Sequence, residues 1–321
     1  MSSENPTQYC RLSNHSVIAI TGKDNKNFLQ GQLTCDLEKL NQNHGLYGGY
    51  ANIQGRLIST FYLCEQETQL LLITPTSNVE PLLTALKKYS VFSKIVFSQT
   101  DLQVLSVFGE NSKNEFEKRL DITVSDELLS NSIHQDLNIL RTISQQESFL
   151  IIGTPEKIRT VEEKMSGVTQ ADHSAWQAFL ISQDICELNE HSIEKFLPSE
   201  INFSKFKGVS FDKGCFMGQE VIARMHYLGK SKKSLCQVQI TSPQIQDIIS
   251  TSRILDADGK AAGEIAAIAH QGKQNTNANA NANALAIMLN TKISDDKATF
   301  SIDGISNSSI TIDGSRDQVA G

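Results

Sequence analysis

The sequence predicts an α+β protein that ends in a small all-β domain. Strand-like and helix-like segments alternate over the first hundred residues, whereas short strands and turns follow one another after about residue 230. The 321 residues are enough for two or three domains. We therefore expect an α+β region of two lobes over residues 1–230 and a β-barrel-like domain over residues 231–321.

The α+β region carries the clearest periodic patterns. Thr21–Asp24 has the pattern of a helix-capping box, and the helix expected after it carries Phe28, Leu29 and Leu33. Residues 110–150 are polar and, apart from one strand, indicate no element. The expected strands are Val17–Ile20, Ser59–Cys64, Gln69–Ile73, Val91–Phe97, Leu102–Phe108 and Phe149–Ile152, and the further helices are Pro81–Tyr89, Pro155–Met165 and Ser174–Ile185.

The C-terminal region reads as short strands joined by turns, one of them an Asp258-Gly259 hairpin signal. The expected strands are Leu235–Ile240, Arg253–Leu255, Gly263–Ile268, Leu285–Leu289, Ala298–Ile302 and Ser309–Ile312. Asn and Ala alternate over residues 275–284, and this segment lacks the large apolar side chains that drive burial. We expect it to be an expanded hairpin loop with no chemical role.

The composition excludes several classes of protein. No apolar run approaches the roughly 20 residues that span a bilayer, and Met1–Pro6 resembles neither a signal peptide nor a transit peptide. We expect a bacterial-type cytoplasmic protein with no membrane partner. The six cysteines include no C-x-x-C pair and the seven histidines are scattered, so we predict free thiols and no stably bound metal.

The charge of the chain is unevenly distributed. The net charge is −7, but residues 205–233 contain seven basic residues against Asp212 and Glu220, a net charge of +5. Such a stretch indicates either an anionic ligand or a solvated lysine-rich turn. The acidic balance of the whole chain argues against strong direct binding of nucleic acid.

The most specific pattern is the run from Lys213 to Glu220, Lys-Gly-Cys-Phe-Met-Gly-Gln-Glu. Gly214 and Gly218 leave Cys215 uncrowded, and the segment after it predicts a short helix with Glu220 and Arg224 one turn apart. A cysteine beside lysine and near a helix start is expected to have thiolate character. Most free cysteines are small core residues, which is our interpretation of Cys35, Cys64, Cys186 and Cys236; Cys10 receives no role.

With Gly208–Phe211 before it and Arg224 after it, this run resembles the signature of the YgfZ family. These are folate-binding proteins related to the T-protein (aminomethyltransferase) of the glycine cleavage system. Further stretches agree with the family: Ile20–Gly22, Phe28–Asp36, Gly55-Arg56, Lys88–Lys94 and Phe196–Pro198. The resemblance covers residues 15–100 and 170–235, and it implies a T-protein-like fold with three lobes around a folate-binding cavity.

The resemblance also implies a function: a folate-binding accessory protein for the synthesis or repair of iron–sulfur enzymes, including enzymes that thiolate tRNA. Its functional residue would be Cys215, acting as a nucleophilic or redox thiolate or as one ligand of a transient cluster. Because a cluster normally takes four thiolates, a partner would supply the others. The expected partners are folate and iron–sulfur enzymes or assembly proteins, and an accessory role is favoured over catalysis of one-carbon transfer.

The candidate ligand residues follow from the same resemblance. Trp176 with Phe179 and Leu180 has the pattern of a helix core stripe, but the resemblance implies that its indole contacts the pterin ring of tetrahydrofolate or a derivative. His15 stands near the place of a second folate-contacting tryptophan of the family. Candidates for the carboxylates of the glutamate tail are Arg224, Lys213 and Lys230. Gln219 and Glu220 are expected to hydrogen-bond the polar edge of the pterin or to cap the cysteine loop, and Phe216 is a further residue of the motif.

Two alternatives remain open. One is a tetrahydrofolate-dependent aminomethyltransferase like the T-protein, although the Leu-Glu-Ala-Gly run common to T-proteins is absent and Leu180–Asp184 reads Leu-Ile-Ser-Gln-Asp. The other is a non-catalytic module that binds RNA or protein through residues 205–233. RNA readers combine basic and aromatic side chains, and this stretch offers only Phe206, Phe211, Phe216 and Tyr227.

Overall fold

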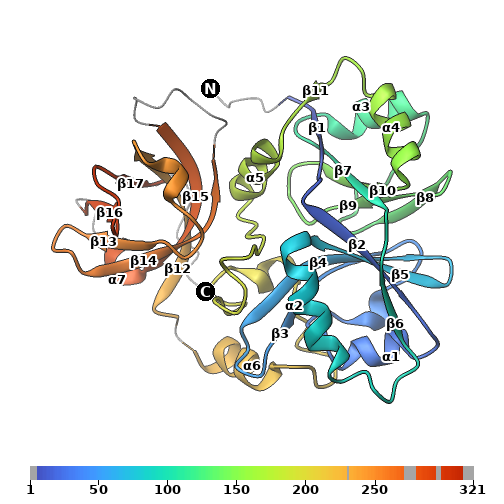
Figure 1. Ribbon diagram of the computed structural model, residues 1–321, viewed down its shortest axis with the longest axis horizontal. Helices are drawn as coiled ribbons and strands as arrows, with labels where there is room; N and C mark the ends of the chain where they lie inside the picture. Colours follow the sequence, from blue (N-terminus) through green and yellow to red (C-terminus); the bar gives the residue numbers. More distant parts are fainter. Residues whose placement is uncertain (1–5, 230, 271–279, 294–297, 314–321) are drawn as a thin grey trace.

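The computed structural model describes residues 6–229, 231–270, 280–293 and 298–313. It contains two open sheets and one closed barrel, with helix α5 (His173–Ser182) between the barrel and the sheets (Figure 1). Within these residues no helix is long and apolar enough to cross a membrane. The predicted combination of an α+β region and a C-terminal barrel is confirmed.

An antiparallel five-stranded sheet forms the N-terminal lobe. Its strands, in spatial order, are β3 (Leu46–Ala51), β4 (Leu57–Gln66), β5 (Gln69–Pro75), β2 (His15–Thr21) and β6 (Val96–Gln99). Alternate residues of β2 face opposite sides. Ile18 and Ile20 join the core under helices α1 (Asn25–Gln30) and α2 (Thr76–Lys87), whereas Val17 and Ala19 join the central core of the molecule. Both faces of this sheet are therefore buried.

A six-stranded sheet forms the second lobe. Its strands, in spatial order, are β11 (Thr169–Gln170), β1 (Gln8–Arg11), β7 (Gln103–Phe108), β10 (Ser148–Gly153), β9 (Leu137–Arg141) and β8 (Asn131–His134). Helices α3 (Ser112–Leu120) and α4 (Pro155–Lys164) bury Phe116, Ile158 and Val161 against one face. The other face adds Leu150 and Ile152 to the central core, so the two sheets share one hydrophobic interior.

The C-terminal barrel closes because its last strand pairs with its first. The strands around the ring are β12 (Lys233–Ser242), β15 (Ala280–Leu289), β14 (Ala261–Ala269), β13 (Arg253–Asp256), β16 (Phe300–Ile302) and β17 (Ser309–Ile312). The short helix α7 (Asn290–Ile293) follows β15. Pairing of β17 with both β16 and β12 leaves no free strand edge in the ring.

Part of the alternating Asn/Ala segment is a barrel strand, so the prediction of a loop is wrong for residues 280–284. Ala282 and Ala284 are fully buried inside the barrel, and Asn281 and Asn283 are exposed. The alternation matches the two-residue period of a strand, and small side chains fit the interior of a narrow barrel. Residues 275–279 lie outside the described residues.

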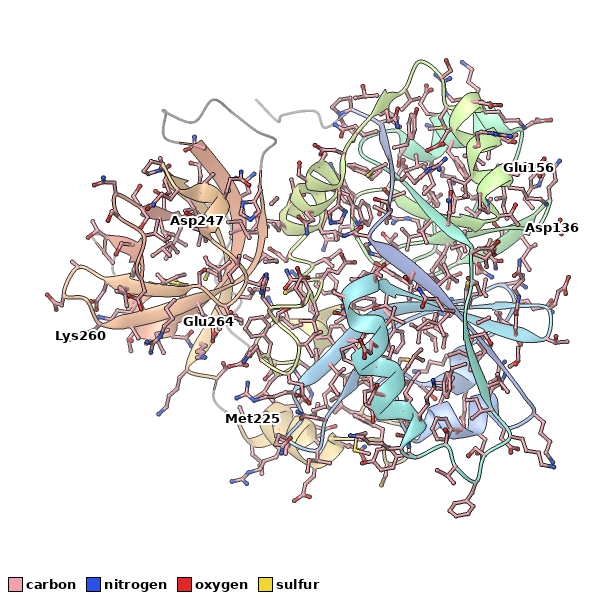
Figure 2. All side chains as sticks on the ribbon, viewed as in Figure 1. Asp136, Glu156, Met225, Asp247, Lys260 and Glu264 are labelled. Carbon is pink, nitrogen blue, oxygen red and sulfur yellow. The ribbon has the colours of Figure 1, made fainter. Side chains whose placement is uncertain are left out.

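The barrel is attached to the rest of the molecule through α5. A register shift in β14 between Ile265 and Ala267 accompanies the entry of Ala266 into the same core as Trp176 and Phe179 of α5. Lys233 is the first residue of β12, and its ammonium forms ion pairs with Glu200 at 3.3 Å and with Glu264 at 3.2 Å; Figure 2 labels Glu264. Apolar and ionic contacts thus join barrel and α+β region.

Helix α2 and strand β6 start well away from their predicted positions. Helix α2 begins at Thr76 instead of Pro81, because Val79, Leu82 and Leu86 form one buried stripe that extends past the proline. Strand β6 begins at Val96 instead of Val91, after a turn. The expected capping box is also wrong, since Thr21 ends β2 and the Asp24 carboxylate accepts a hydrogen bond from the Lys94 amide at 2.8 Å.

Strand β3 was not expected because Gly48 and Gly49, at its centre, have low strand propensity. Packing explains both glycines. A Cβ on Gly48 would lie 2.5 Å from the Cys35 sulfur, and one on Gly49 would lie 2.8 Å from Leu57. Strand β1, which contains the buried Cys10, and helix α3 were likewise not predicted.

Candidate functional site

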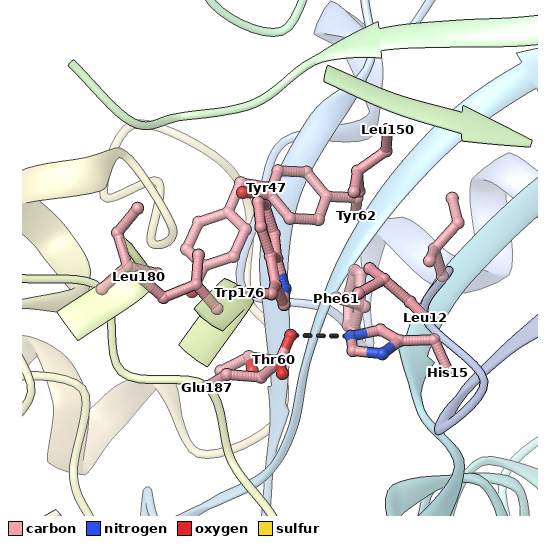
Figure 3. Close-up of a pocket in the computed structure, with 12 residues that line it drawn as sticks. Leu12, His15, Tyr47, Thr60, Phe61, Tyr62, Leu150, Trp176, Leu180 and Glu187 are labelled. Atoms are coloured by element: carbon pink, nitrogen blue, oxygen red, sulfur yellow. Dashed lines mark hydrogen bonds and ion pairs between the residues drawn. The ribbon is translucent and has the colours of Figure 1, made fainter. Parts of the chain in front are cut away.

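A narrow pocket lies where the two open sheets meet α5 (Figure 3). Strands β2, β3 and β4 provide one wall, and α5 with the segment after it provides the other. The residues that line the pocket are Leu12, His15, Tyr47, Thr60, Phe61, Tyr62, Ile73, Leu150, Trp176, Leu180, Ile185 and Glu187. The interior that a water molecule can reach is about 10 Å³, which is room for one water. In this conformation the pocket is almost closed.

A chain of hydrogen bonds crosses the polar end of this pocket. Glu187 Oε1 lies 2.9 Å from His15 Nε2, and His15 Nδ1 lies 3.0 Å from Asn14 Oδ1. The other end of the same amide, Asn14 Nδ2, lies 2.7 Å from His173 Nε2. Two imidazoles and a carboxylate are therefore linked through one amide, with the carboxylate at the pocket end.

Trp176 forms the aromatic wall of the pocket. Its ring stacks on Phe179, with centroids 5.5 Å apart and planes 21° apart, and Phe108 packs edge-on against it at 5.3 Å. The side chain is 1% exposed, and its indole Nε1 is buried without a hydrogen-bond partner in the described residues. A buried N–H normally finds a partner, so this wall presents an unused donor.

The cysteine motif lies on a second part of the molecule, beside the chain from Leu33 to Cys35. The Ser210 amide donates to the Thr34 carbonyl at 2.9 Å. The Lys213 ammonium donates to the carbonyls of Leu33 at 2.9 Å and Cys35 at 2.7 Å, and burial lowers its pKa. Lys213 was expected to place its positive charge beside a Cys215 thiolate. Its ammonium instead links the motif to the segment from Leu33 to Cys35.

Gly218 fits the motif against the turn between β3 and β4. It is the N-terminal cap residue of α6 (Gln219–Leu228) and has φ of +79°, in the left-handed region that favours glycine. A Cβ at this position would lie 2.5 Å from the Asn52 carbonyl oxygen. Gly214, in contrast, has no atom within 4 Å of such a Cβ. The two motif glycines therefore differ: Gly218 is required by packing, and Gly214 lies in open space.

Cys215 is the one exposed cysteine in the described part of the chain, which includes all six. Cys10, Cys35, Cys64 and Cys186 are buried, and Cys236 is partly buried in β12. Burial raises the pKa of Cys10 and Cys236 to about 11 and that of the other three to about 12. The motif cysteine is thus the most accessible of the six, and burial keeps the other thiols protonated.

The basic stretch predicted from the sequence is partly neutralised by the fold. Lys213 is bound to carbonyls, Lys205 pairs with Asp184 at 3.2 Å, and Lys233 has two carboxylate partners. Glu220 and Arg224 are both exposed, and the described residues contain no ion pair between them. Lys230 lies outside the described residues. Three of the described basic residues of the stretch are therefore engaged within the fold.

The fold brings Trp176 and His15 into one pocket, although 160 residues of chain separate them. Lys213 and Arg224 do not line it; as ligands of a folate tail they remain predictions. Glu187 belongs to the pocket and was not recognised, because an isolated Cys186-Glu187 pair after a helix has no distinguishing pattern. The ranges described contain no group of three His, Cys, Asp or Glu residues able to hold a metal ion.

Comparisons with known proteins agree with the motif. No family model matches the chain. It is 29% identical to the tRNA-modifying protein YgfZ of Colwellia psychrerythraea over 265 residues, 81% of each chain. It is 31% identical to the protein of that name from Yersinia enterocolitica over 241 residues, 73% of this chain and 71% of the relative.

The fold has a solved counterpart. The glycine cleavage system aminomethyltransferase T of Bartonella henselae superimposes with a TM-score of 0.74, over 97% of this chain and 85% of that protein, at 15% identity. This likeness confirms the predicted T-protein-like fold. The motif around Cys215 and the similarity over most of both chains together lead to one conclusion: the chain belongs to the YgfZ family of tRNA-modifying proteins.

Proposed function

We propose that this chain is a cytoplasmic, folate-binding accessory protein for the synthesis or repair of iron–sulfur enzymes, including enzymes that thiolate tRNA. Cys215 is its active residue. The observation that carries the proposal is that Cys215, alone among the described cysteines, is exposed. It lies two residues after Lys213, whose ammonium is hydrogen-bonded to the Leu33 and Cys35 carbonyls. Relatives named tRNA-modifying proteins support the tRNA part of the proposal.

An exposed thiol suits the ligation of a cluster that is shared with, or passed to, a partner. Cys215 lies four residues before α6, and neither neighbouring side chain covers it, since Gly214 has none and Phe216 is buried. One cysteine supplies one of the four thiolates that a cluster takes. A cluster held through Cys215 therefore needs ligands from a partner, which fits an accessory role better than storage of a cluster.

The side chains that line the Trp176 pocket have the chemistry that a pterin ring would need for binding. The indole gives an aromatic face and an unpartnered N–H, and Glu187 gives a carboxylate for ring N–H groups. When bound, a reduced folate supplies a carrier for one-carbon units. Because the closed pocket holds only one water, Trp176 and its neighbours must move apart to admit the ring. We expect binding to be coupled to that opening.

Titration with 5-formyltetrahydrofolate tests the ligand. Trp176 is the only tryptophan, so its emission, corrected for absorption by the ligand, reports on the pocket while calorimetry reports on binding anywhere. Saturable quenching with matching heat supports the pocket. Heat without quenching places folate elsewhere, and the absence of both signals contradicts folate binding.

Complementation tests the role of Cys215. In a strain that lacks its own YgfZ protein, the Cys215→Ser chain should fail to restore thiolated tRNA nucleosides and iron–sulfur enzyme activity, while its urea unfolding midpoint stays unchanged. Cys236→Ser is the matched control, since that thiol is half-covered in a barrel strand and should be dispensable. Full restoration by Cys215→Ser would refute the proposal.

The aminomethyltransferase alternative shares the fold and is tested separately. Where T-proteins have Leu-Glu-Ala-Gly, this chain has Leu180–Asp184, and Gln237 of the barrel donates to the Ser182 carbonyl at 3.2 Å and to the Asp184 carboxylate at 2.7 Å. These residues therefore attach α5 to the barrel. Turnover with an aminomethylated lipoyl carrier protein and tetrahydrofolate would favour the enzyme over the accessory factor.

A further inference from the structure

The charged end of the Trp176 pocket contains a hydrogen-bonded chain of polar residues that is not needed merely to fill a cavity. We propose that Glu187, oriented by His15, is the residue by which this pocket selects its ligand. Its carboxylate accepts hydrogen bonds from the adjacent ring N–H and 2-amino group of a 2-amino-4-oxopteridine and disfavours a ring with a carbonyl at position 2. This inference rests on the proposed function, because it takes the pterin of a folate as the ligand.

The Glu187 carboxylate lies where a ligand in the pocket could contact it. Glu187 lines the pocket, its side chain is 22% exposed, and Oε1 is held by His15, whose side chain is 4% exposed (Figure 3). Oε2 has no hydrogen-bond partner in the described residues. Most of the other lining side chains are apolar or aromatic, so this oxygen is the strongest hydrogen-bond acceptor offered to a ligand.

The hydrogen-bond network around His15 is compatible with a charged ring. With the Asn14 amide as placed, its oxygen accepts from His15 Nδ1 and its nitrogen donates to His173 Nε2. Nε2 of His15 donates to the carboxylate, and a second donation from Nδ1 to the Asn14 oxygen fits an imidazolium at this position. His173 then accepts at Nε2 and is neutral. Burial lowers the pKa of His173 overall, against the opposing charge of Glu187.

His15 keeps the carboxylate ionised. Burial by itself would raise the pKa of Glu187, but the charge and hydrogen bond of His15 lower the pKa overall. The other titratable groups that face Glu187 are Tyr47, Tyr62 and Cys186, and burial raises the pKa of each. They stay neutral near pH 7, so the state of Glu187 depends on the imidazole.

The selection follows from hydrogen-bond complementarity. A 2-amino-4-oxopteridine presents two neighbouring N–H donors, which match the two oxygens of a carboxylate. Lumazine, the 2,4-dioxo ring, presents a carbonyl beside one N–H and would set an oxygen against the charged carboxylate. Losing one hydrogen bond to a charged group lowers affinity by about 10- to 100-fold. A stacking wall alone, such as Trp176, would bind both rings.

Calorimetry on the full chain tests the inference. The unaltered protein should bind pterin about 10- to 100-fold more tightly than lumazine. Glu187→Gln should weaken binding of 5-formyltetrahydrofolate by a similar factor and remove the preference for pterin. Glu190→Gln is the matched control, because Glu190 is an exposed carboxylate in the same segment and should leave both affinities unchanged.

Measuring ligand affinity as a function of pH distinguishes an electrostatic effect of His15 on Glu187 from a packing role of His15. Between pH 7.5 and 5.5 the unaltered chain keeps Glu187 ionised, because its pKa lies below the ordinary value. In His15→Gln the cation is gone and burial raises that pKa, so affinity relative to the unaltered chain should fall as the pH falls. A constant ratio across this range would refute the role of His15.

The outcomes distinguish this inference from the proposed function. If the unaltered chain binds 5-formyltetrahydrofolate but does not distinguish pterin from lumazine, or if Glu187→Gln binds normally, selection by Glu187 is overturned and folate binding stands. If the unaltered chain binds no folate, both are overturned. The comparison of pterin with lumazine needs no variant, so a variant that fails to fold cannot obscure the result.

Discussion

Replacing Gly218 by alanine should loosen the cysteine motif from the turn between β3 and β4. An alanine held at φ of +79° costs about 1–2 kcal/mol relative to glycine. Its Cβ would also lie 2.5 Å from the Asn52 carbonyl, which accepts the Gly55 amide at 2.9 Å and closes the turn, and such overpacking costs about 1–3 kcal/mol. We therefore expect Gly218→Ala to lower the free energy of unfolding by about 2–5 kcal/mol.

Urea unfolding followed by circular dichroism measures this loss as a lower midpoint. Gly214→Ala is the matched control, because a Cβ there meets no atom within 4 Å, and its effect should stay within about 0.5 kcal/mol. Both glycines belong to the same motif, so a difference between them reports packing and not membership of the motif. Equal unfolding midpoints for the two variants would refute the packing argument for Gly218.

Three further predictions concern the motif and the barrel. In the native chain one thiol, Cys215, should react rapidly with a disulfide reagent, against six thiols in guanidinium chloride; rapid reaction of a second native thiol would contradict the burial described. Lys213→Met removes the donor to two carbonyls and should destabilise the fold by about 1–3 kcal/mol in urea, with Lys232→Met as the exposed control; equal midpoints would show that the contact is dispensable. Ala282→Asn buries an amide in the barrel and should lower the thermal midpoint by several degrees, whereas Asn283→Ala should not; the reverse order would mean that β15 has the other register.

Long periodic segments were predictable because their pattern reports one local geometry. The strands at Val17–Ile20 and Gln69–Ile73 and the helix over Pro155–Lys164 lie where apolar spacing indicates them. Strand β3 was not predictable, since its central glycines are selected by contact with Cys35 and Leu57, which lie elsewhere in the chain. The same limit applied to Ala280–Ala284, where the closed barrel makes small residues suitable for burial.

The sequence by itself determined the family, the α+β class with its C-terminal barrel, and the importance of the run around Cys215, because each depends on residues adjacent in the chain. Only the tertiary structure decided that Trp176, His15 and Glu187 share one pocket, and that Lys213 is hydrogen-bonded to the Leu33 and Cys35 carbonyls. Contacts between segments more than 100 residues apart depend on how sheets and helices pack. No local pattern records that packing, so the partners of a buried charge become visible only in the folded chain.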